Sequence, residues 1–193
     1  MKKDIILAGV GGQGILSIAA CIGMAALEES LHLKQAEVHG MSQRGGAVHS
    51  NLRLSSEPIA SDLIPEGKAD IIIAVEPMES LRYLPMLNKT GWIITSSNPF
   101  INIKDYPEIE QLMQEIQKQP QYITLDANAM AKDCGNIKAA NMIVLGAATP
   151  FLDLKISNIE NAVKAIFGSK GADIVELNLK AIKAGREHAM KQL

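Results

Sequence analysis

Short apolar runs alternate along this chain with longer segments in which apolar residues recur at helical spacing. Strand character is predicted for residues 4–8, 33–38, 47–54, 70–75, 92–96 and 122–126. Helices are predicted at about 14–28, 77–87 and 107–118, and residues 127–193 are predicted as helices interrupted at 149–150 and 168–171. This alternation predicts an α/β fold, a Rossmann-like open and mostly parallel sheet with helices on both faces.

Length and composition set the class of protein. The 193 residues, 47% of them hydrophobic, fit a single domain over 1–193 with a sizeable core. No apolar run approaches the ~20 residues that span a bilayer, and Met1-Lys2-Lys3-Asp4 leads straight into a strand. The net charge is -2 with mixed signs along the chain. We therefore expect a cytoplasmic protein with neither nucleic acid nor membrane as partner.

Cysteine and histidine usage argues against a metal centre. Cys21 and Cys134 are far apart, and neither belongs to a Cys-x-x-Cys pair. This excludes a self-contained iron–sulfur cluster or a cysteine-rich zinc site. The four histidines are scattered without metal-ligand spacing, so no metal site is expected. Cys21, on an apolar helix face, is expected to be a small buried hydrophobe.

A glycine-rich turn follows the first predicted strand. Gly9, Gly11 and Gly14 satisfy G-x-G-x-x-G between a strand and a helix, where backbone amides can approach a phosphate at a helix N-terminus. Gly12 and Gln13 add a further glycine and a large polar amide. Three interpretations stay open: contact with a phosphate or other anion, binding of a dinucleotide, or a tight turn needed only for helix–strand packing.

Glu37, at the end of the second predicted strand, bears on the dinucleotide interpretation. It lies near the position of a ribose-binding acid in dinucleotide-binding folds. However, a polar, glycine-bearing loop follows it directly, where those folds usually continue into a helix.

That loop, from His39 to Gly46, has the highest local concentration of residues that could bind a ligand. Its polar and flexible members are Ser42, Gln43, Arg44, Gly45 and Gly46. They bring together a hydroxyl, an amide and a planar guanidinium on a backbone that can bend. A polar loop at the end of a parallel strand, beside the glycine turn, lies where open α/β sheets bind ligands. The alternative is a surface turn in which a neighbouring carboxylate holds Arg44.

Together, at this spacing, the two segments resemble the gamma-type subunits of the 2-oxoacid:ferredoxin oxidoreductases. The likeness is greatest to the small (beta) subunits of the indolepyruvate enzymes, to which the Ser42–Gly46 sequence points. Further blocks that resemble this family are residues 69–82, 84–87, 91–94 and 141–146, the last beginning with Asn141.

The resemblance implies an accessory subunit of a complex that oxidatively decarboxylates a 2-oxoacid to an acyl-CoA. Thiamine diphosphate, magnesium and [4Fe-4S] clusters would lie on a larger partner subunit, and electrons would pass to ferredoxin. This chain would pack over the thiamine-bearing subunit, with contact to coenzyme A left open, and would hold none of those cofactors alone. An isolated subunit of this kind is also expected to self-associate when its partner is missing.

The candidate cofactor-binding residues are Gly9, Gly11, Gly12, Gln13, Gly14, Glu37, His39, Ser42, Gln43, Arg44, Gly45, Gly46 and Asn141. Arg44 is the one catalytic candidate. The rival hypothesis is a free-standing dinucleotide-binding oxidoreductase or regulatory domain that uses the glycine turn for its nucleotide.

Overall fold

The computed structural model describes residues 1–40 and 45–193, without the side chain of His39. Its strands are β1 (Lys2–Val10), β2 (His32–His39), β3 (Ala47–Ser55), β4 (Ala69–Ala74), β5 (Leu87–Ser96) and β6 (Tyr122–Leu125). Its α-helices are α1 (Ile15–Glu28), α2 (Pro77–Arg82), α3 (Ile109–Gln117), α4 (Ala127–Cys134), α5 (Ala140–Ala148), α6 (Ile156–Phe167) and α7 (Ala172–Met190). Short 3₁₀ turns are η1 (Leu84–Met86), η2 (Ile137–Ala139), η3 (Thr149–Phe151) and η4 (Gly168–Lys170).

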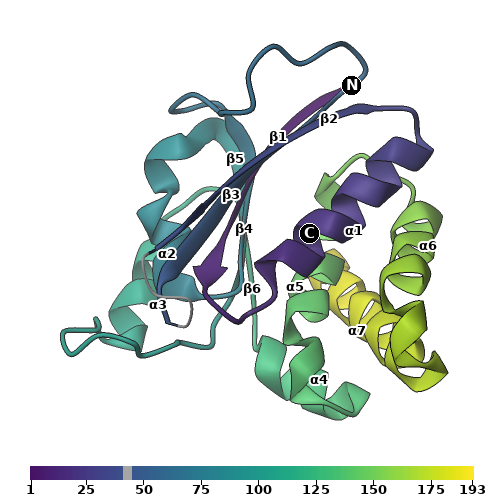
Figure 1. Cartoon of the computed structure of the whole chain (residues 1–193). Coiled ribbons are helices and arrows are strands. Elements are labelled where there is room, and N and C mark those ends of the chain that lie inside the picture. Colours follow the sequence, from purple (N-terminus) through teal and green to yellow (C-terminus); the bar gives the residue numbers. More distant parts are fainter. Residues whose placement is uncertain (41–44) are drawn as a thin grey trace.

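The strands form one sheet in the order β2-β3-β1-β4-β5-β6 (Figure 1). β1, β4, β5 and β6 pair in parallel, whereas β3 runs antiparallel to both β1 and β2. The predicted mostly parallel α/β sheet is therefore confirmed. The apolar runs in β1 and β4 are continuous because both strands are central and covered on both faces.

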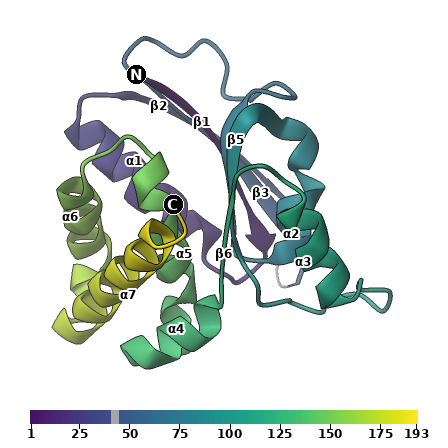
Figure 2. The same cartoon turned by 180° about the vertical axis from the view of Figure 1, so that it is seen from behind.

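Helices cover both faces of the sheet, as predicted. α1 and α4 to α7 pack on one face, and α2 and α3 on the other (Figures 1 and 2). Side chains of β1 alternate between the two layers: Ile5 and Leu7 join the larger core under α1, α5, α6 and α7, while Ile6 and Ala8 join the smaller one. In the described part of the chain, no helix is long and apolar enough to cross a membrane.

The helix predicted to reach residue 87 is shorter than the pattern indicated. α2 ends at Arg82, the 3₁₀ turn η1 follows, and β5 begins at Leu87 instead of Trp92. Pro85 explains the early end, because proline lacks an amide hydrogen and disfavours helical backbone at the residue before it. The start of β5 was missed because Lys89 and Thr90 are exposed and polar.

Two glycines let α5 and α7 cross at very short range. An added Cβ at Gly146 would lie 2.2 Å from the carbonyl oxygen of Ile182, and one at Gly185 would lie 1.9 Å from that of Ile143. Backbone thus meets backbone at this crossing. The contact fixes α5, whose first turn carries Asn141 to the glycine turn.

Candidate ligand site around the glycine turn

Hydrogen bonds from the side chain and the backbone of Gln13 close the glycine turn. The Gln13 side-chain oxygen Oε1 accepts a hydrogen bond from the Val10 amide at 2.8 Å, and the Gln13 amide donates to the Val10 carbonyl at 3.1 Å. Gly12 and Gly14 have φ angles of +99° and +80°, a backbone region that favours glycine. Gly14 is the N-cap of α1, and no side chain caps that end of the helix.

The glycines of the turn have different neighbours. An added Cβ at Gly9 would lie 2.8 Å from Ile15 Cδ1, and one at Gly14 would lie 2.4 Å from Asn141 Nδ2. At Gly12 nothing lies within 4 Å. Close packing therefore accounts for glycine at positions 9 and 14, which is what the tight-turn interpretation requires. Gly12 instead leaves open space beside the start of α1.

Asn141 is brought to the turn from far along the sequence. Its Nδ2 donates a hydrogen bond to the Gly14 carbonyl at 3.2 Å, and its Oδ1 accepts one from the Met142 amide at 3.0 Å. Asn141 thus holds Gly14, the N-cap of α1, in place.

The end of the His39–Gly46 loop also meets the turn. The Gly11 amide donates to the Gly46 carbonyl at 2.8 Å, and Asn102 Nδ2 donates to the Gly45 carbonyl at 2.6 Å. The predicted ligand-binding residues Ser42, Gln43 and Arg44 lie outside the described residues, as does the side chain of His39.

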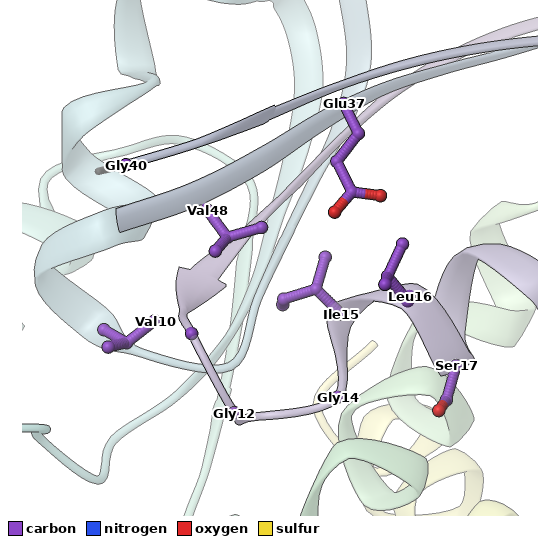
Figure 3. Close-up of a pocket in the computed structure, with 10 residues that line it drawn as sticks. Val10, Gly12, Gly14, Ile15, Leu16, Ser17, Glu37, Gly40 and Val48 are labelled. Atoms are coloured by element: carbon purple, nitrogen blue, oxygen red, sulfur yellow. The ribbon is translucent and has the colours of Figure 1, made fainter. Parts of the chain in front are cut away.

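A first cavity of about 750 Å³ lies between the glycine turn and strands β2 and β3 (Figure 3). It is lined by Val10, Gly11, Gly12, Gly14, Ile15, Leu16, Ser17, Glu37, Gly40 and Val48. The cavity joins Glu37 to the turn, although the two are distant in sequence. β3 stands between β1 and β2, however, so Glu37 does not occupy the strand next to β1 on which the ribose-binding acid of a dinucleotide fold resides.

A second cavity of about 490 Å³ lies on the other side of the turn, where β4, β5 and β6 end. It is lined by Gly12, Gln13, Gly14, Val75, Ser96, Asn98, Pro99, Phe100, Asn128, Ile137, Lys138, Ala140 and Asn141. Ligands of open α/β sheets bind at this edge. Sequence reasoning missed Ser96, Asn98, Asn128 and Lys138. The signal for the first three was polar residues at the ends of apolar strands, whereas Lys138 lies in η2 and had no such signal.

Hydrogen bonds join the polar residues on this second cavity. Asn98 Oδ1 accepts from the Ser96 hydroxyl and from the Asn128 amide, both at 2.9 Å, and Asn98 Nδ2 donates to Asp126 Oδ1 at 2.9 Å. Asp126 also caps α4 by accepting from the Ala129 amide at 2.9 Å. That backbone hydrogen bond, followed by the one from Asn98, lowers the pKa of the Asp126 carboxyl.

Glu76 anchors the segment that borders the second cavity. Its carboxylate is fully buried, caps α2 through the Glu79 amide at 2.8 Å, and accepts from the Phe100 amide at 3.3 Å and from the Tyr106 hydroxyl. Burial, followed by this bond to Glu76, raises the pKa of Tyr106. Glu76 therefore holds both the start of α2 and segment 97–108.

Cys21 is fully buried, as predicted, and burial raises the pKa of its thiol to about 12. Such a thiol stays protonated and inert near neutral pH. Among the residues that the structure describes, no group of three histidine, cysteine, aspartate or glutamate side chains is arranged to hold a metal ion.

Solved structures similar to this chain share its fold. An oxidoreductase from Magnetococcus marinus matches the whole chain with a TM-score of 0.80 at 21% identity. It is described as 2-oxoglutarate:ferredoxin oxidoreductase with 2-oxoglutarate, coenzyme A and succinyl-CoA bound, and the matched part is 31% of its length. Pyruvate oxidoreductase subunit PORC from Thermotoga maritima matches with a TM-score of 0.75 at 17% identity, over 97% of this chain and 96% of its own.

Sequence comparison identifies the family. Indolepyruvate oxidoreductase subunit IorB of Archaeoglobus fulgidus is 37% identical over 98% of this chain and 96% of its own length. The profile of the family described as pyruvate ferredoxin/flavodoxin oxidoreductase matches residues 4–188. With that match covering nearly the whole chain, the chain belongs to the pyruvate ferredoxin/flavodoxin oxidoreductase family.

Proposed function

We propose that this chain is the small accessory subunit of a 2-oxoacid:ferredoxin oxidoreductase that acts on aryl 2-oxoacids, above all indolepyruvate. The complex would oxidatively decarboxylate the 2-oxoacid to an acyl-CoA and pass the electrons to ferredoxin. The observation that carries this proposal is the near full-length similarity to relatives named indolepyruvate oxidoreductase subunit, at 31–37% identity. Relatives named 2-oxoglutarate synthase subunit are less similar, at 29–30%.

Thiamine diphosphate, magnesium and the [4Fe-4S] clusters are assigned to a larger partner subunit. A [4Fe-4S] cluster is normally held by four cysteine thiolates, and this chain has two cysteines. When bound, thiamine diphosphate supplies the carbanion-stabilising chemistry of the decarboxylation. The role of this chain is to bind and orient groups at the edge of that site.

Coenzyme A is the ligand that we assign to the glycine turn. The start of α1 has no acidic residue in its first turn, and the helix dipole there favours an anion such as a phosphate. Lys138, on the second cavity, adds a positive charge on the other side of Gly12 and Gly14. Coenzyme A in the Magnetococcus marinus structure, which has the same fold, supports this assignment.

The rival hypothesis, a free-standing dinucleotide-binding protein, is disfavoured by the sheet. β3 separates Glu37 from the strand that carries the glycine turn, so Glu37 is not on the strand that holds the ribose-binding acid of a dinucleotide fold.

The test is reconstitution with a larger, thiamine- and iron–sulfur-bearing subunit from the same organism. Indolepyruvate oxidation, with coenzyme A and ferredoxin or a viologen dye as acceptor, should require both subunits. The purified single chain should carry no thiamine diphosphate, iron or magnesium and should show no turnover. Pyruvate and 2-oxoglutarate serve as comparison substrates. Turnover by the single chain, or a reconstituted complex that prefers 2-oxoglutarate, would contradict the proposal.

A further inference from the structure

Segment 97–108, all of which the structure describes, joins β5 to α3 without a helix or strand of its own. It is nevertheless tied to the rest of the molecule at several points. Near its start, Asn98 Oδ1 accepts a hydrogen bond from the Asn128 amide at 2.9 Å. Farther along, Asn102 Nδ2 donates to the Gly45 carbonyl at 2.6 Å. The segment therefore has a defined course, although it projects from the body of the molecule beside α3 (Figures 1 and 2).

Glu76 holds the middle and the end of the same segment. Its carboxylate oxygen Oε1 accepts hydrogen bonds from the Phe100 amide at 3.3 Å and from the Tyr106 hydroxyl. The Glu76 side chain is fully buried, and its other oxygen caps α2, so this attachment point is itself fixed. Pro99 and Pro107 further restrict the backbone near the two ends of the segment.

The segment also presents apolar side chains to solvent. Phe100, Ile101 and Ile103 are exposed. Ile137 in η2 is exposed too and lines the second cavity together with Phe100, so the apolar surface continues from the segment onto the rim of that cavity. Exposed apolar groups that share one surface mark an interaction site. Because hydrogen bonds already fix the segment, a partner can bind it with little further loss of conformational entropy.

The partner that fits this surface is the larger subunit of the proposed complex. In the Magnetococcus marinus oxidoreductase the matched fold is 31% of one chain. In ketoisovalerate oxidoreductase subunit VorA of Methanothermobacter marburgensis, which is 26% identical to this chain, the matched part is 36%. A fold that occurs within longer chains has further polypeptide of the same protein against which it can pack. This favours the larger subunit over a second copy of this chain as the occupant.

We propose that segment 97–108 is a preformed docking arm for the larger subunit, and that Glu76 and Tyr106 set the strength of assembly by holding the arm in shape. The inference rests on the proposed function, from which it takes the larger subunit. The three exposed apolar side chains of the arm make the contact, and an apolar groove on the larger subunit receives them. Glu76 and Tyr106 are positioning residues, because they act on assembly through the arm.

The experiment separates the hold on the arm from the contact surface. Tyr106→Phe removes one hydroxyl and leaves the exposed apolar side chains unchanged. Binding of the full chain to the larger, thiamine-bearing subunit is measured by analytical sedimentation. We expect Tyr106→Phe to weaken binding by about three- to tenfold, the effect of one lost hydrogen bond. Tyr122→Phe, on β6 and outside the arm, is the matched control and should leave binding unchanged.

A second comparison shows whether Tyr106 acts through the arm. Ile101→Asp/Ile103→Asp removes the contact surface and should weaken binding at least about tenfold. Tyr106→Phe added to this variant should have little further effect, because residues that act through one contact are not additive. An effect of Tyr106→Phe that is equally large in both backgrounds would contradict the positioning role.

Proteolysis reports the state of the arm directly. Trypsin cleaves after lysine, and Lys104 is exposed within the arm. We expect cleavage there to be faster in Tyr106→Phe than in the wild type, because the arm opens locally more often. Bound larger subunit should suppress this cleavage in both proteins. Hydrogen exchange at the Phe100 amide, which bonds to Glu76, should be faster in the variant as well.

The outcomes distinguish this inference from the proposed function. Equal binding and equal cleavage of Tyr106→Phe and wild type would overturn the inference. An assembled complex that oxidises indolepyruvate while its arm is still cleaved contradicts the docking arm and leaves the proposed function standing. A complex that assembles through the arm but has no 2-oxoacid activity contradicts the proposed function and supports the arm. Failure of the two wild-type chains to bind would contradict both.

Discussion

Backbone conformation and packing each favour glycine at position 14. Its φ is +80°, and an added Cβ would lie 2.4 Å from Asn141 Nδ2. Gly14→Ala should lower the free energy of unfolding by about 1–2 kcal/mol from the backbone alone, with a further loss from displacing Asn141. Gly12→Ala is the matched control, because Gly12 also has a positive φ but meets nothing within 4 Å.

Urea unfolding of the two variants measures the difference between them. The double variant Gly14→Ala/Asn141→Ala should recover the part of the loss that comes from the clash. Equal losses in Gly12→Ala and Gly14→Ala would show that the contact with Asn141 has no energetic weight.

Arg44 lies outside the described residues, so its role stays a prediction from sequence. A guanidinium at the subunit interface would hold an anionic group of substrate or coenzyme A, or a partner carboxylate, through its bidentate fork. Arg44→Lys keeps the charge but loses the fork. It should impair the reconstituted complex by on the order of 2 to 4 kcal/mol in kcat/KM if the contact is desolvated, with thermal melting of the isolated chain unchanged. Unchanged kinetics would indicate that the loop is a surface turn.

At the scale of elements, the N-cap of α4 should make stability depend on pH. Hydrogen bonds lower the folded-state pKa of Asp126, so its stabilising contribution is present above the unfolded pKa of about 3.9. It is lost as pH falls through the lower folded pKa, because the unfolded chain then binds the proton more tightly. Asp126→Asn should keep the cap at pH 7 and lose less stability than wild type on acidification.

Melting temperatures of both proteins at pH 7 and at pH values below the unfolded pKa provide the measurement. Asp126→Ala is the reference for loss of the cap itself, expected to cost about 0.5–2 kcal/mol at pH 7. Parallel acid profiles for wild type and Asp126→Asn would contradict the assignment.

The crossing of α5 and α7 is the element contact most sensitive to one methyl group. Gly185→Ala would place a Cβ 1.9 Å from the Ile143 carbonyl oxygen, so the helices must separate. We expect a loss of at least about 1–3 kcal/mol, the usual cost of overpacking. Gly168→Ala is the control: nothing lies within 4 Å, and its φ of -56° suits alanine. Chemical denaturation should show Gly168→Ala neutral or slightly stabilised.

At the scale of the whole molecule, segment 97–108 projects beside α3 (Figures 1 and 2). Two of its apolar side chains are exposed. Ile101 is 73% exposed and Ile103 48%. Exposed apolar groups of this kind mark interaction sites, and we expect this segment to contact the larger subunit. Ile101→Asp/Ile103→Asp should weaken assembly at least tenfold in a pull-down or sedimentation assay. Leu63→Asp, on a residue 58% exposed in another loop, is the control.

Self-association belongs to the same scale. If the segment is an interface, the isolated chain should form concentration-dependent oligomers that the double aspartate variant reduces. A wild-type chain that stays monomeric and fails to bind the larger subunit would argue against both expectations.

The sequence by itself determined the class of fold and most of its elements. The strand at 70–75 is an unbroken apolar run, and the helix after the glycine turn has apolar residues at helical spacing. Such patterns are local, because an element must present apolar side chains to the core wherever it lies in the fold. The two-segment motif near the N-terminus also sufficed to indicate the family. Local patterns failed where one residue outweighed the rest, as Pro85 did in ending α2 early.

Only the tertiary structure decided what surrounds the turn. The insertion of β3 between β1 and β2 moved Glu37 away from the ribose position, and strand order leaves no local signature in sequence. Likewise, the contact of Asn141 with Gly14 joins residues 127 positions apart. The second cavity, with Ser96 and Asn98, arises because parallel strands end at one edge of the sheet. Such contacts follow from the packing of whole elements, so no window of sequence contains them.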